Sequence, residues 1–243
     1  MPLYRDAAIV LRTHKLRESD RIITMLTRDH GKIRAVQHGA RKTRSRAGAR
    51  LEPGMLADVQ CYTGKTNLDT VKETAIHAAY GDHIARDYGA YTAASAVLET
   101  ADRLTEERET SRPQFTLLTG ALAALARGDH SAGLVLDSYL LRALAIGGWA
   151  ASFTDCAGCG QQGPHRAFNL ASGGAVCVQC RAPGSAAPRT ETFALLAALQ
   201  TGDWEAADAS DEPERREARG LVAAYVQWHL ERGVRSLRLV ETG

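Results

Sequence analysis

The sequence predicts an α+β multidomain protein: a five-stranded N-terminal β-barrel, an α-helical bundle domain, and a cysteine-rich module inserted within the helical domain. Three observations support this prediction. Short β-branched segments fill the first 80 residues, alanine- and leucine-rich segments of helical period follow, and two Cys-x-x-Cys pairs interrupt the helical part. We therefore expect a barrel at 1–80, a helical domain at 81–153 and 185–243, and a metal module at 154–184.

The N-terminal part contains five short apolar stretches separated by turn residues. The turn signals are Asp29-His30-Gly31, Glu52-Pro53-Gly54 and the run from Thr63 to Asn67. Five short strands with this even spacing are typical of a small barrel of the OB type. The strands are expected at 7–13, 21–27, 32–38, 55–62 and 68–74.

The rest of the chain has helical periodicity. Pro113, Gly128 and Gly147-Gly148 separate the segments. Apolar residues cover most of the surface of the segment 131–148, so this helix is expected to be the buried spine of a bundle. Helices are expected at 83–105, 114–127, 131–148, 190–200 and 213–232.

Four of the five cysteines form two Cys-x-x-Cys pairs, Cys156 with Cys159 and Cys177 with Cys180, separated by 17 residues. This spacing is typical of a four-thiolate Zn²⁺ site, which has no open coordination position and is therefore structural. The alternative is a pair of redox sites. A thioredoxin-type site uses one pair at the start of a helix, whereas these pairs lie among glycines. Cys61 is expected to be a small buried residue.

Positive charge is concentrated near the N-terminus. Residues 1–50 contain 13 Lys or Arg and 4 Asp or Glu, although the net charge of the chain is only +2. Such a run is either a solvated loop or a polyanion-binding surface, and its position between two barrel strands favours nucleic acid. The candidate DNA-binding residues are Arg12, Arg21, Lys32, Arg34, Arg41, Lys42, Arg44, Arg46 and Arg50.

Aromatic residues are scarce in the barrel, which contains only Tyr4 and Tyr62 within residues 1–79. Base stacking therefore contributes little, and phosphate contacts are expected to supply the affinity. This predicts binding of both single- and double-stranded DNA, with a steep dependence on salt.

No motif predicts a catalytic centre or a small-molecule substrate, so we expect no enzyme activity. His229-Leu230-Glu231 follows the cysteines, the reverse of the order in zinc deaminases, and Gly64-Lys65-Thr66 lacks the first glycine of a P-loop because Val59 occupies that position. The N-terminus lacks a secretory pattern, and no apolar stretch is long enough for a membrane span, so a cytoplasmic location is expected. Three alternatives remain: a zinc-ribbon regulator that recognises duplex DNA, a metal-dependent nucleic-acid hydrolase, and a scaffold without DNA contacts.

Several separate stretches resemble one known family. They are Ala8-Ile-Val-Leu11, Glu18-Ser-Asp-Arg-Ile-Ile23 with Leu26-Thr27 and Gly31, Gly39-Ala-Arg-Lys42 with Ser45, Leu51-Glu-Pro53, Leu141 to Gly148, Cys156-x-x-Cys159-Gly160, Phe168, Gly173-Gly174 and Cys177-x-x-Cys180. In this order, over most of residues 1–180, the sequence resembles the bacterial recombination mediator family RecO.

The resemblance implies an OB-fold, a helical domain and a zinc module. It also implies binding of single- and double-stranded DNA, annealing of complementary strands without nucleotide hydrolysis, and cooperation with RecR in loading RecA onto strands coated by single-strand DNA-binding protein. A protein with these roles acts at the nucleoid. The residues that it assigns are the four ligands Cys156, Cys159, Cys177 and Cys180, and the basic barrel positions Arg34, Arg41, Lys42, Arg44 and Arg46.

Overall fold

The computed structural model describes residues 2–16, 18–39 and 51–230. The chain divides into two compact units, Met1–Asp129 and His130–Gly243. The domains expected from the sequence, at 1–80, at 81–153 with 185–243, and at 154–184, remain a prediction. None of the described helices is long and apolar enough to cross a membrane.

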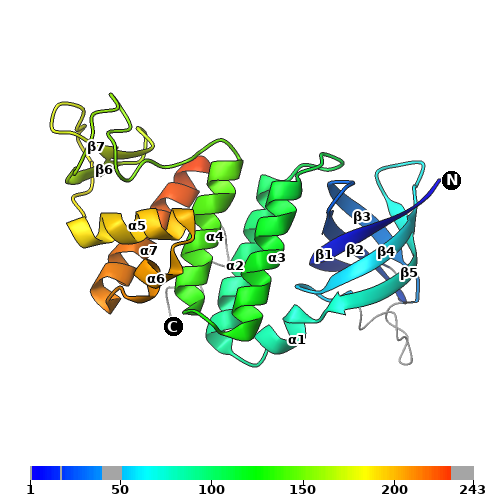
Figure 1. Cartoon of the computed structure of the whole chain (residues 1–243). Coiled ribbons are helices and arrows are strands. Elements are labelled where there is room, and N and C mark those ends of the chain that lie inside the picture. The colour runs from blue at the N-terminus through cyan, green and yellow to red at the C-terminus, as the bar shows by residue number, and fades with distance from the viewer. Residues whose placement is uncertain (1, 17, 40–50, 231–243) are drawn as a thin grey trace. The chain divides into compact units, whose positions relative to one another are not determined.

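The first part of the chain forms the predicted barrel of five strands (Figure 1). The strands follow the order β1-β2-β3-β5-β4, and the barrel closes because β4 also pairs with β1. Only β3 and β5 are parallel, and the other pairs are antiparallel. This is a small closed barrel of the OB type. Its strands are β1 (Leu3–Leu16), β2 (Asp20–Thr27), β3 (Lys32–Gln37), β4 (Leu56–Tyr62) and β5 (Asp69–Ala78).

Strand β1 is twice as long as the predicted segment 7–13 because it serves two partners. Its first half pairs with β4, starting at Leu3, and its second half pairs with β2, ending at Leu16. Charged residues such as Arg5 and Lys15 lie in the two extensions and obscure the apolar pattern there. Backbone pairing therefore sets the ends of β1 more than side-chain burial does.

The β1–β2–β3 part of the barrel has two buried faces. Ile23 and Met25 belong to the barrel core. Successive side chains alternate between faces, so Thr24 and Leu26 face outwards, yet they are only 1% and 0% exposed. Other parts of the first unit therefore cover the outer face. The core cluster consists of Ala8, Val10, Ile23, Met25, Ile33, Ala35, Leu51, Met55, Ala57, Val59 and Cys61.

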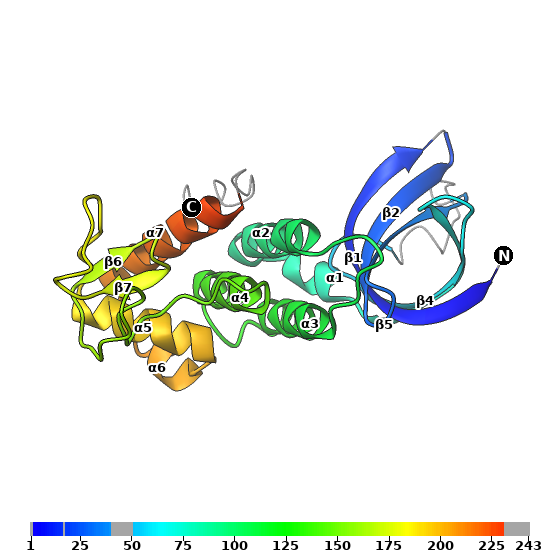
Figure 2. The same cartoon turned by 90° about the horizontal axis from the view of Figure 1, so that it is seen from above.

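Three helices complete the first unit: α1 (Tyr80–Ile84), α2 (Tyr88–Leu104) and α3 (Arg112–Arg127). Helices α2 and α3 pack side by side, as Figure 2 shows, and α2 also contacts β1. The prediction of a single helix at 83–105 is wrong at its N-terminal end, where the structure has the end of α1 and a break before α2. Asp87 caps a new helix there, because its carboxylate accepts a 2.6 Å hydrogen bond from the amide of Ala90.

The connection between α2 and α3 runs against the barrel. The amide of Arg108 donates to the carbonyl of Lys32 at 3.0 Å. Gly31 has a φ of +70°, and a Cβ at this position would lie 2.4 Å from the carbonyl oxygen of Glu109. Only glycine fits this close approach of two backbone segments.

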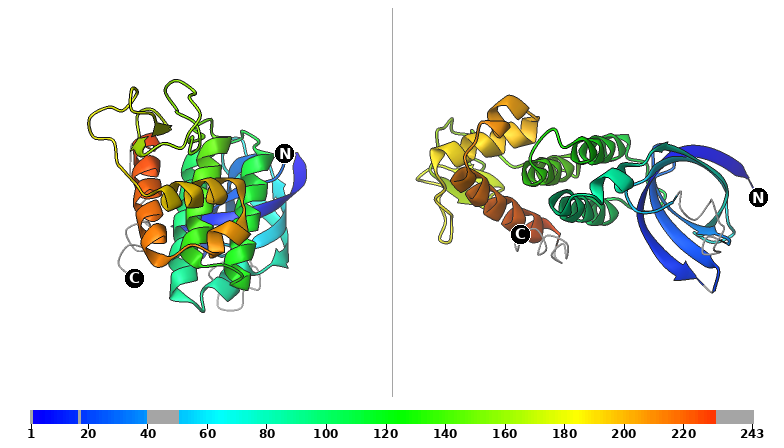
Figure 3. Two further views of the ribbon diagram at one scale, coloured as in Figure 1. Left: turned by 60° about the vertical axis from the view of Figure 1, so that its left-hand side comes forward. Right: turned by 90° about the horizontal axis from the view of Figure 1, so that it is seen from below.

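The second unit is helical and carries a small hairpin (Figure 3). Helices α4, α5 and α7 contact one another, and α4 is buried on most of its surface, as predicted for the spine. The short helix α6 was not predicted; Asp203 caps it through the amide of Ala206. The elements are α4 (Ala132–Ile146), β6 (Ala167–Asn169), β7 (Gly174–Val176), α5 (Thr190–Thr201), α6 (Trp204–Asp208) and α7 (Glu212–His229).

A buried carboxyl group lies between α4 and α7. Asp137 is 2% exposed, and its Oδ2 lies 3.8 Å from Nε of Arg219, too far for a hydrogen bond. Burial raises the pKa of Asp137 from 3.8 to about 7, and Arg219 opposes this rise. Gly133 makes room for the guanidinium, since a Cβ there would lie 1.8 Å from its NH2 atom.

We predict that Asp137→Asn stabilises the protein at pH 8 and loses this advantage as the pH falls. Between about pH 4 and pH 7 the folded protein holds a proton on Asp137 that the unfolded chain has released, so the free energy of unfolding falls as pH rises. The Asn variant lacks this proton linkage, and the expected gain at pH 8 is on the order of 1–3 kcal/mol. Urea unfolding of both proteins at pH 6 and pH 8 measures it. A variant that is equally destabilised at both values would show that the pair with Arg219 dominates instead.

Candidate nucleic-acid interface and metal centre

The four predicted ligands come together in the second unit. The Sγ atoms of Cys156, Cys159, Cys177 and Cys180 all lie within 4.8 Å of one another, and none of the four forms a disulfide. The hairpin β6–β7 lies between the two Cys-x-x-Cys turns in the sequence and brings them together. This confirms the prediction of a cysteine cluster that could hold a metal ion.

The cluster fits a tetrahedral thiolate site. Sγ of Cys159 lies 3.8 Å from Sγ of Cys177, and Zn–S bonds of 2.3 Å in a tetrahedron require a separation of about 3.8 Å. The amide of Cys177 donates to Sγ of Cys156 at 3.3 Å. This hydrogen bond is the main cause that lowers the pKa of Cys156 to about 6, which favours the thiolate form that binds metals. His165 is engaged elsewhere, with Nε2 2.8 Å from the carbonyl of Gln161.

Phe168 connects the metal module to the helices of the second unit. Its ring is 2% exposed and lies next to the rings of Phe153, Phe193 and Tyr225, with centroids 6.1, 6.5 and 6.1 Å away. Phe193 belongs to α5 and Tyr225 to α7. The module has little core of its own, so this aromatic cluster contributes to its stability, and a metal held by the four cysteines would add to it.

The candidate DNA-binding residues of the barrel fall on two faces. Arg12 and Arg34 are both paired with Thr24 in the strand register, so they share the outer face. Lys32 lies two residues from Arg34 on the same face. Arg21 alternates with Thr24 and lies on the other face, at the start of β2.

Two of these cations are used inside the first unit. Arg12 Nε lies 2.7 Å from Oδ2 of Asp102 in α2, and Lys32 Nζ lies 3.3 Å from Oδ1 of the same carboxylate. The Lys32 side chain is only 13% exposed. Arg12 and Lys32 therefore attach the barrel to α2. The side chain of Arg34, by contrast, has no ion pair or hydrogen bond with residues 2–16, 18–39 or 51–230.

The other candidate cations are Arg21, which is paired with Gln37 at the end of β3, and five residues that follow β3 in the sequence. Arg21 forms an ion pair with Glu52. Arg41, Lys42, Arg44, Arg46 and Arg50 lie outside the described residues. Residues 40–50 are called the basic segment below; the segment carries these five cations and no carboxylate.

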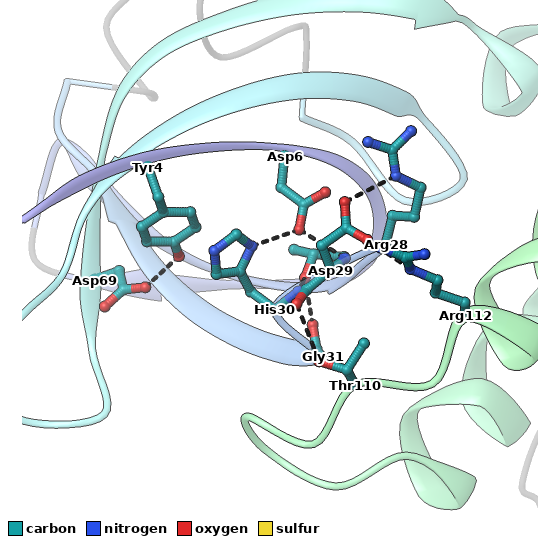
Figure 4. A network of polar contacts seen from close by, with 10 residues as sticks. Tyr4, Asp6, Arg28, Asp29, His30, Gly31, Asp69, Thr110 and Arg112 are labelled. Carbon is teal, nitrogen blue, oxygen red and sulfur yellow. Dashed lines mark hydrogen bonds and ion pairs between the residues drawn. The ribbon is translucent and has the colours of Figure 1, made fainter.

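Buried aspartates form a polar network in the barrel that the sequence did not predict (Figure 4). The side chain of Asp6 is 0% exposed; its Oδ2 lies 2.7 Å from Nδ1 of His30 and accepts a 2.9 Å hydrogen bond from the amide of Asp29. Asp29 in turn forms ion pairs with Arg28 and with Arg112 of α3. The network therefore stabilises the β2–β3 turn against the following helices.

Asp69 is the second centre of this network. It accepts hydrogen bonds from Tyr4 Oη, from Arg108 NH2 at 2.7 Å and from the amide of Gly64 at 3.0 Å. Burial alone would raise the pKa of Asp69, but these three donors outweigh it and hold the pKa below its usual value. The amide of Gly64 is thus used within the β4–β5 turn, which agrees with the interpretation of this stretch as a hairpin.

The two barrel tyrosines are also engaged within the protein. The ring of Tyr4 stacks on His30 with centroids 4.3 Å apart, and Lys72 lies 5.7 Å from the ring centroid of Tyr62. Neither ring is free to stack on a base without losing these contacts. This agrees with the expectation that phosphate contacts dominate.

A groove of about 500 Å³ lies between the barrel and helices α1 and α2. Its floor is apolar and includes Leu11, Met55, Ile84 and Leu98, each at most 7% exposed. Its polar lining consists of Arg12 and the carboxylates of Glu52, Asp82, Glu99 and Asp102. Three of these carboxylates are paired with cations: Glu52 with Arg21, Glu99 with Arg103, and Asp102 with Arg12 and Lys32.

Comparison with known proteins gives matches along the whole chain. The family model described as Recombination protein O N terminal matches residues 1–80, and the one described as Recombination protein O C terminal matches residues 85–238. The chain is 54% identical to the DNA repair protein RecO of Streptomyces avermitilis and of Streptomyces coelicolor, over 99% of this chain and 100% of each relative. It is also 54% identical to the DNA repair protein RecO of Thermobifida fusca, over 99% of both chains. With its OB-type barrel, helical second unit and cysteine cluster, the chain belongs to the RecO family of DNA repair proteins.

Proposed function

We propose that this chain binds single- and double-stranded DNA, anneals complementary strands without an enzymatic step, and acts with RecR to load RecA onto strands coated by single-strand DNA-binding protein. The observation that carries the proposal is the match to the RecO family over the whole chain. The cations of the basic segment, with Arg34 of β3, are the charges proposed for this role.

Annealing follows from charge neutralisation. Two DNA strands repel each other through their phosphates, and a protein that neutralises part of both backbones lowers this repulsion. Base pairing then supplies the sequence specificity, so the protein needs neither base readout nor an active site. The carboxylates of Asp6, Asp69 and Asp102 are engaged with histidine, tyrosine, arginine or lysine, which supports this interpretation over that of a metal-dependent hydrolase.

The contact surface proposed for DNA is narrower than the set of nine cations expected from the sequence. It consists of Arg34 and the five cations of the basic segment. Arg12 and Lys32 are assigned to the attachment of α2, because both form ion pairs with Asp102. Arg21 is left out as well, because it is paired with Glu52.

Zn²⁺ is the proposed metal of the cysteine cluster. Four thiolates are the ligand set that Zn²⁺ prefers in structural sites, and such a set leaves no position for a substrate. The metal therefore stabilises the second unit, and the first unit binds the DNA. The proposed location is the cytoplasm, at the nucleoid. The proposed partners there are RecR, RecA and single-strand DNA-binding protein.

A strand-annealing assay with two complementary labelled oligonucleotides tests the function. We expect faster annealing in the absence of any nucleotide cofactor, also when the strands are first coated with single-strand DNA-binding protein. Incubation of a labelled single strand with Mg²⁺ or Mn²⁺ is the control for hydrolysis. Absence of annealing, or cleavage that a point mutation abolishes, would refute the proposal.

We predict that Arg44→Gln with Arg46→Gln weakens binding of single-stranded DNA by about tenfold at low salt, because two phosphate contacts are lost. The matched control is Arg12→Gln with Lys32→Gln, which removes the same charge from ion-paired positions of the barrel. That pair should change affinity by less than about twofold while lowering stability slightly. Fluorescence anisotropy gives both affinities. Equal losses in the two double variants would show that the whole outer face binds DNA.

We predict that Cys177→Ser releases the metal and lowers the melting temperature by on the order of 10 °C, because metal binding contributes directly to folding of the module. The affinity for DNA should stay within about twofold, since the basic segment belongs to the other unit. Cys61→Ser is the control, because this cysteine lies in the barrel core and should leave the zinc content unchanged. Zinc quantification and calorimetry provide the measurements. A folded Cys177→Ser protein that no longer binds DNA would contradict the separation of the two roles.

A further inference from the structure

The groove between the barrel and helices α1 and α2 is long and narrow in the way that a peptide requires. All of its lining residues are described, and all belong to the first unit. On α2 they occupy positions 91, 94, 95, 98, 99 and 102, a helical spacing that keeps them on one face of the helix. At a rise of 1.5 Å per residue, the groove follows α2 for about 16 Å, or roughly three helical turns.

Backbone contacts hold the walls of the groove in place. Gly81 of α1 approaches the turn before β4 so closely that a Cβ there would lie 2.6 Å from the carbonyl oxygen of Pro53. This turn is attached to β1, because the amide of Gly54 donates to the carbonyl of Val10 at 2.9 Å and the amide of Val10 donates to the carbonyl of Met55 at 3.0 Å. A groove with fixed walls needs little rearrangement to accept a ligand.

The groove combines an apolar floor with an exposed aromatic side chain. The floor residues Leu11, Met55, Ile84 and Leu98 are buried. In contrast, Tyr91 lies on the same face of α2 and is 54% exposed. An apolar floor accepts apolar side chains of a ligand, and an accessible tyrosine is one of the residue types enriched in protein interfaces.

The two ends of the groove differ in charge. At the end formed by the last turn of α2, Arg12 and Lys32 share the carboxylate of Asp102, so this end has no excess of negative charge. At the end formed by α1, the carboxylate of Asp82 is exposed and has no ion pair in the part of the chain that the structure describes. The other two carboxylates of the lining are paired with arginines. The α1 end therefore favours a cation.

We propose that this groove binds an amphipathic segment of a partner protein, with its apolar side chains on the floor and a lysine or arginine at the α1 end, next to Asp82. A length of roughly three turns suits a peptide helix that lies along α2. The unpaired carboxylate disfavours an acidic peptide at the α1 end. The inference is independent of the proposed function, because none of the cations assigned to DNA lines the groove.

Three fluorescein-labelled peptides test the proposal on the full chain. The first has leucines at helical spacing and lysines on both sides of them. The second has glutamates in place of the lysines, and the third has alanines in place of the leucines. By fluorescence anisotropy, we expect the lysine peptide to bind about tenfold more tightly than either of the other two. Equal or tighter binding of the glutamate peptide, or no binding of the lysine peptide, would overturn the proposal.

Ser95→Trp should block the groove. Ser95 lines it and is partly exposed, and its Oγ donates a 2.8 Å hydrogen bond to the carbonyl of Tyr91 within the same helix. The larger side chain therefore enters the groove without opening the core. We expect the lysine peptide to bind at least about tenfold more weakly at an unchanged melting temperature. Unchanged peptide affinity in the folded variant would show that the groove is not the binding site.

Asp82→Asn tests the charge of the α1 end. The variant should bind the lysine peptide about threefold more weakly and the glutamate peptide more tightly, because an exposed charge pair contributes modestly. The matched control is Glu106→Gln, which removes an exposed carboxylate of the α2–α3 connection outside the groove and should change neither affinity. If Asp82→Asn binds both peptides as the control does, the proposed cation at this end is wrong. Should Ser95→Trp fail to fold, this comparison decides the question, since Asp82 is exposed.

DNA binding distinguishes this inference from the proposed function. Ser95→Trp and Asp82→Asn should both bind single-stranded DNA within about twofold of the unmodified protein, because they leave Arg34 and the basic segment unchanged. Failure of the DNA-binding predictions above leaves the peptide experiment unaffected. A folded Ser95→Trp protein that loses peptide and DNA together would contradict a separate peptide site.

Discussion

The carboxylate of Asp102, near the C-terminal end of α2, receives both Arg12 and Lys32 from the outer face of the barrel. The same principle recurs around the first unit: Asp69 neutralises Arg108, Asp29 neutralises Arg28 and Arg112, and Glu52 neutralises Arg21. Charges in a partly buried interface are stable only when they are paired. The barrel can therefore pack against helices α1–α3 only because its cations meet carboxylates there. Of the four candidate DNA-binding cations among the described residues, Arg12, Arg21 and Lys32 have a carboxylate partner and the Arg34 side chain has none.

This division of charge has a functional consequence. A cation that already has a carboxylate partner offers little to a phosphate, because contact with DNA requires the existing pair to be given up. In the proposed function, the DNA-binding surface is therefore smaller than the full set of nine candidate cations. The cysteine cluster lies in the other unit, within a module that has little core of its own. In the proposed function, a metal held there stabilises this module while the first unit binds DNA.

Local patterns in the sequence were sufficient for the strands, most helices and the cysteine cluster. Alternating apolar residues such as Ile23 and Met25 identify β2, and the spacing of Cys156, Cys159, Cys177 and Cys180 identifies the metal site without any tertiary information. The prediction was less successful where the partner is distant. The length of β1 depends on its pairing with the distant strand β4. The break before α2 has a different cause, since its cap residue Asp87 is a local signal that the apolar pattern did not reveal.

The sequence also could not predict which cations form ion pairs within the protein, because their partners are distant in the chain. Arg12 and Asp102 are 90 residues apart, and so no local signal distinguishes the paired Arg12 from the unpaired Arg34. Asp6, Asp20 and Asp69 were missed as well. Asp69 lies within a predicted strand, and Asp6 and Asp20 lie directly before one. Asp is disfavoured in strands, and this could have marked them as buried and hydrogen-bonded.

The salt dependence of DNA binding tests the central claim most directly. For single-stranded DNA, the slope of log Kobs against log salt is about −0.7 for each phosphate neutralised. If only Arg34 and the five cations of the basic segment contact DNA, the slope for a short oligonucleotide should be about −4. A slope of about −6 or steeper would mean that all nine candidate cations bind phosphates, including Arg12 and Lys32, and would contradict the division of charge described above.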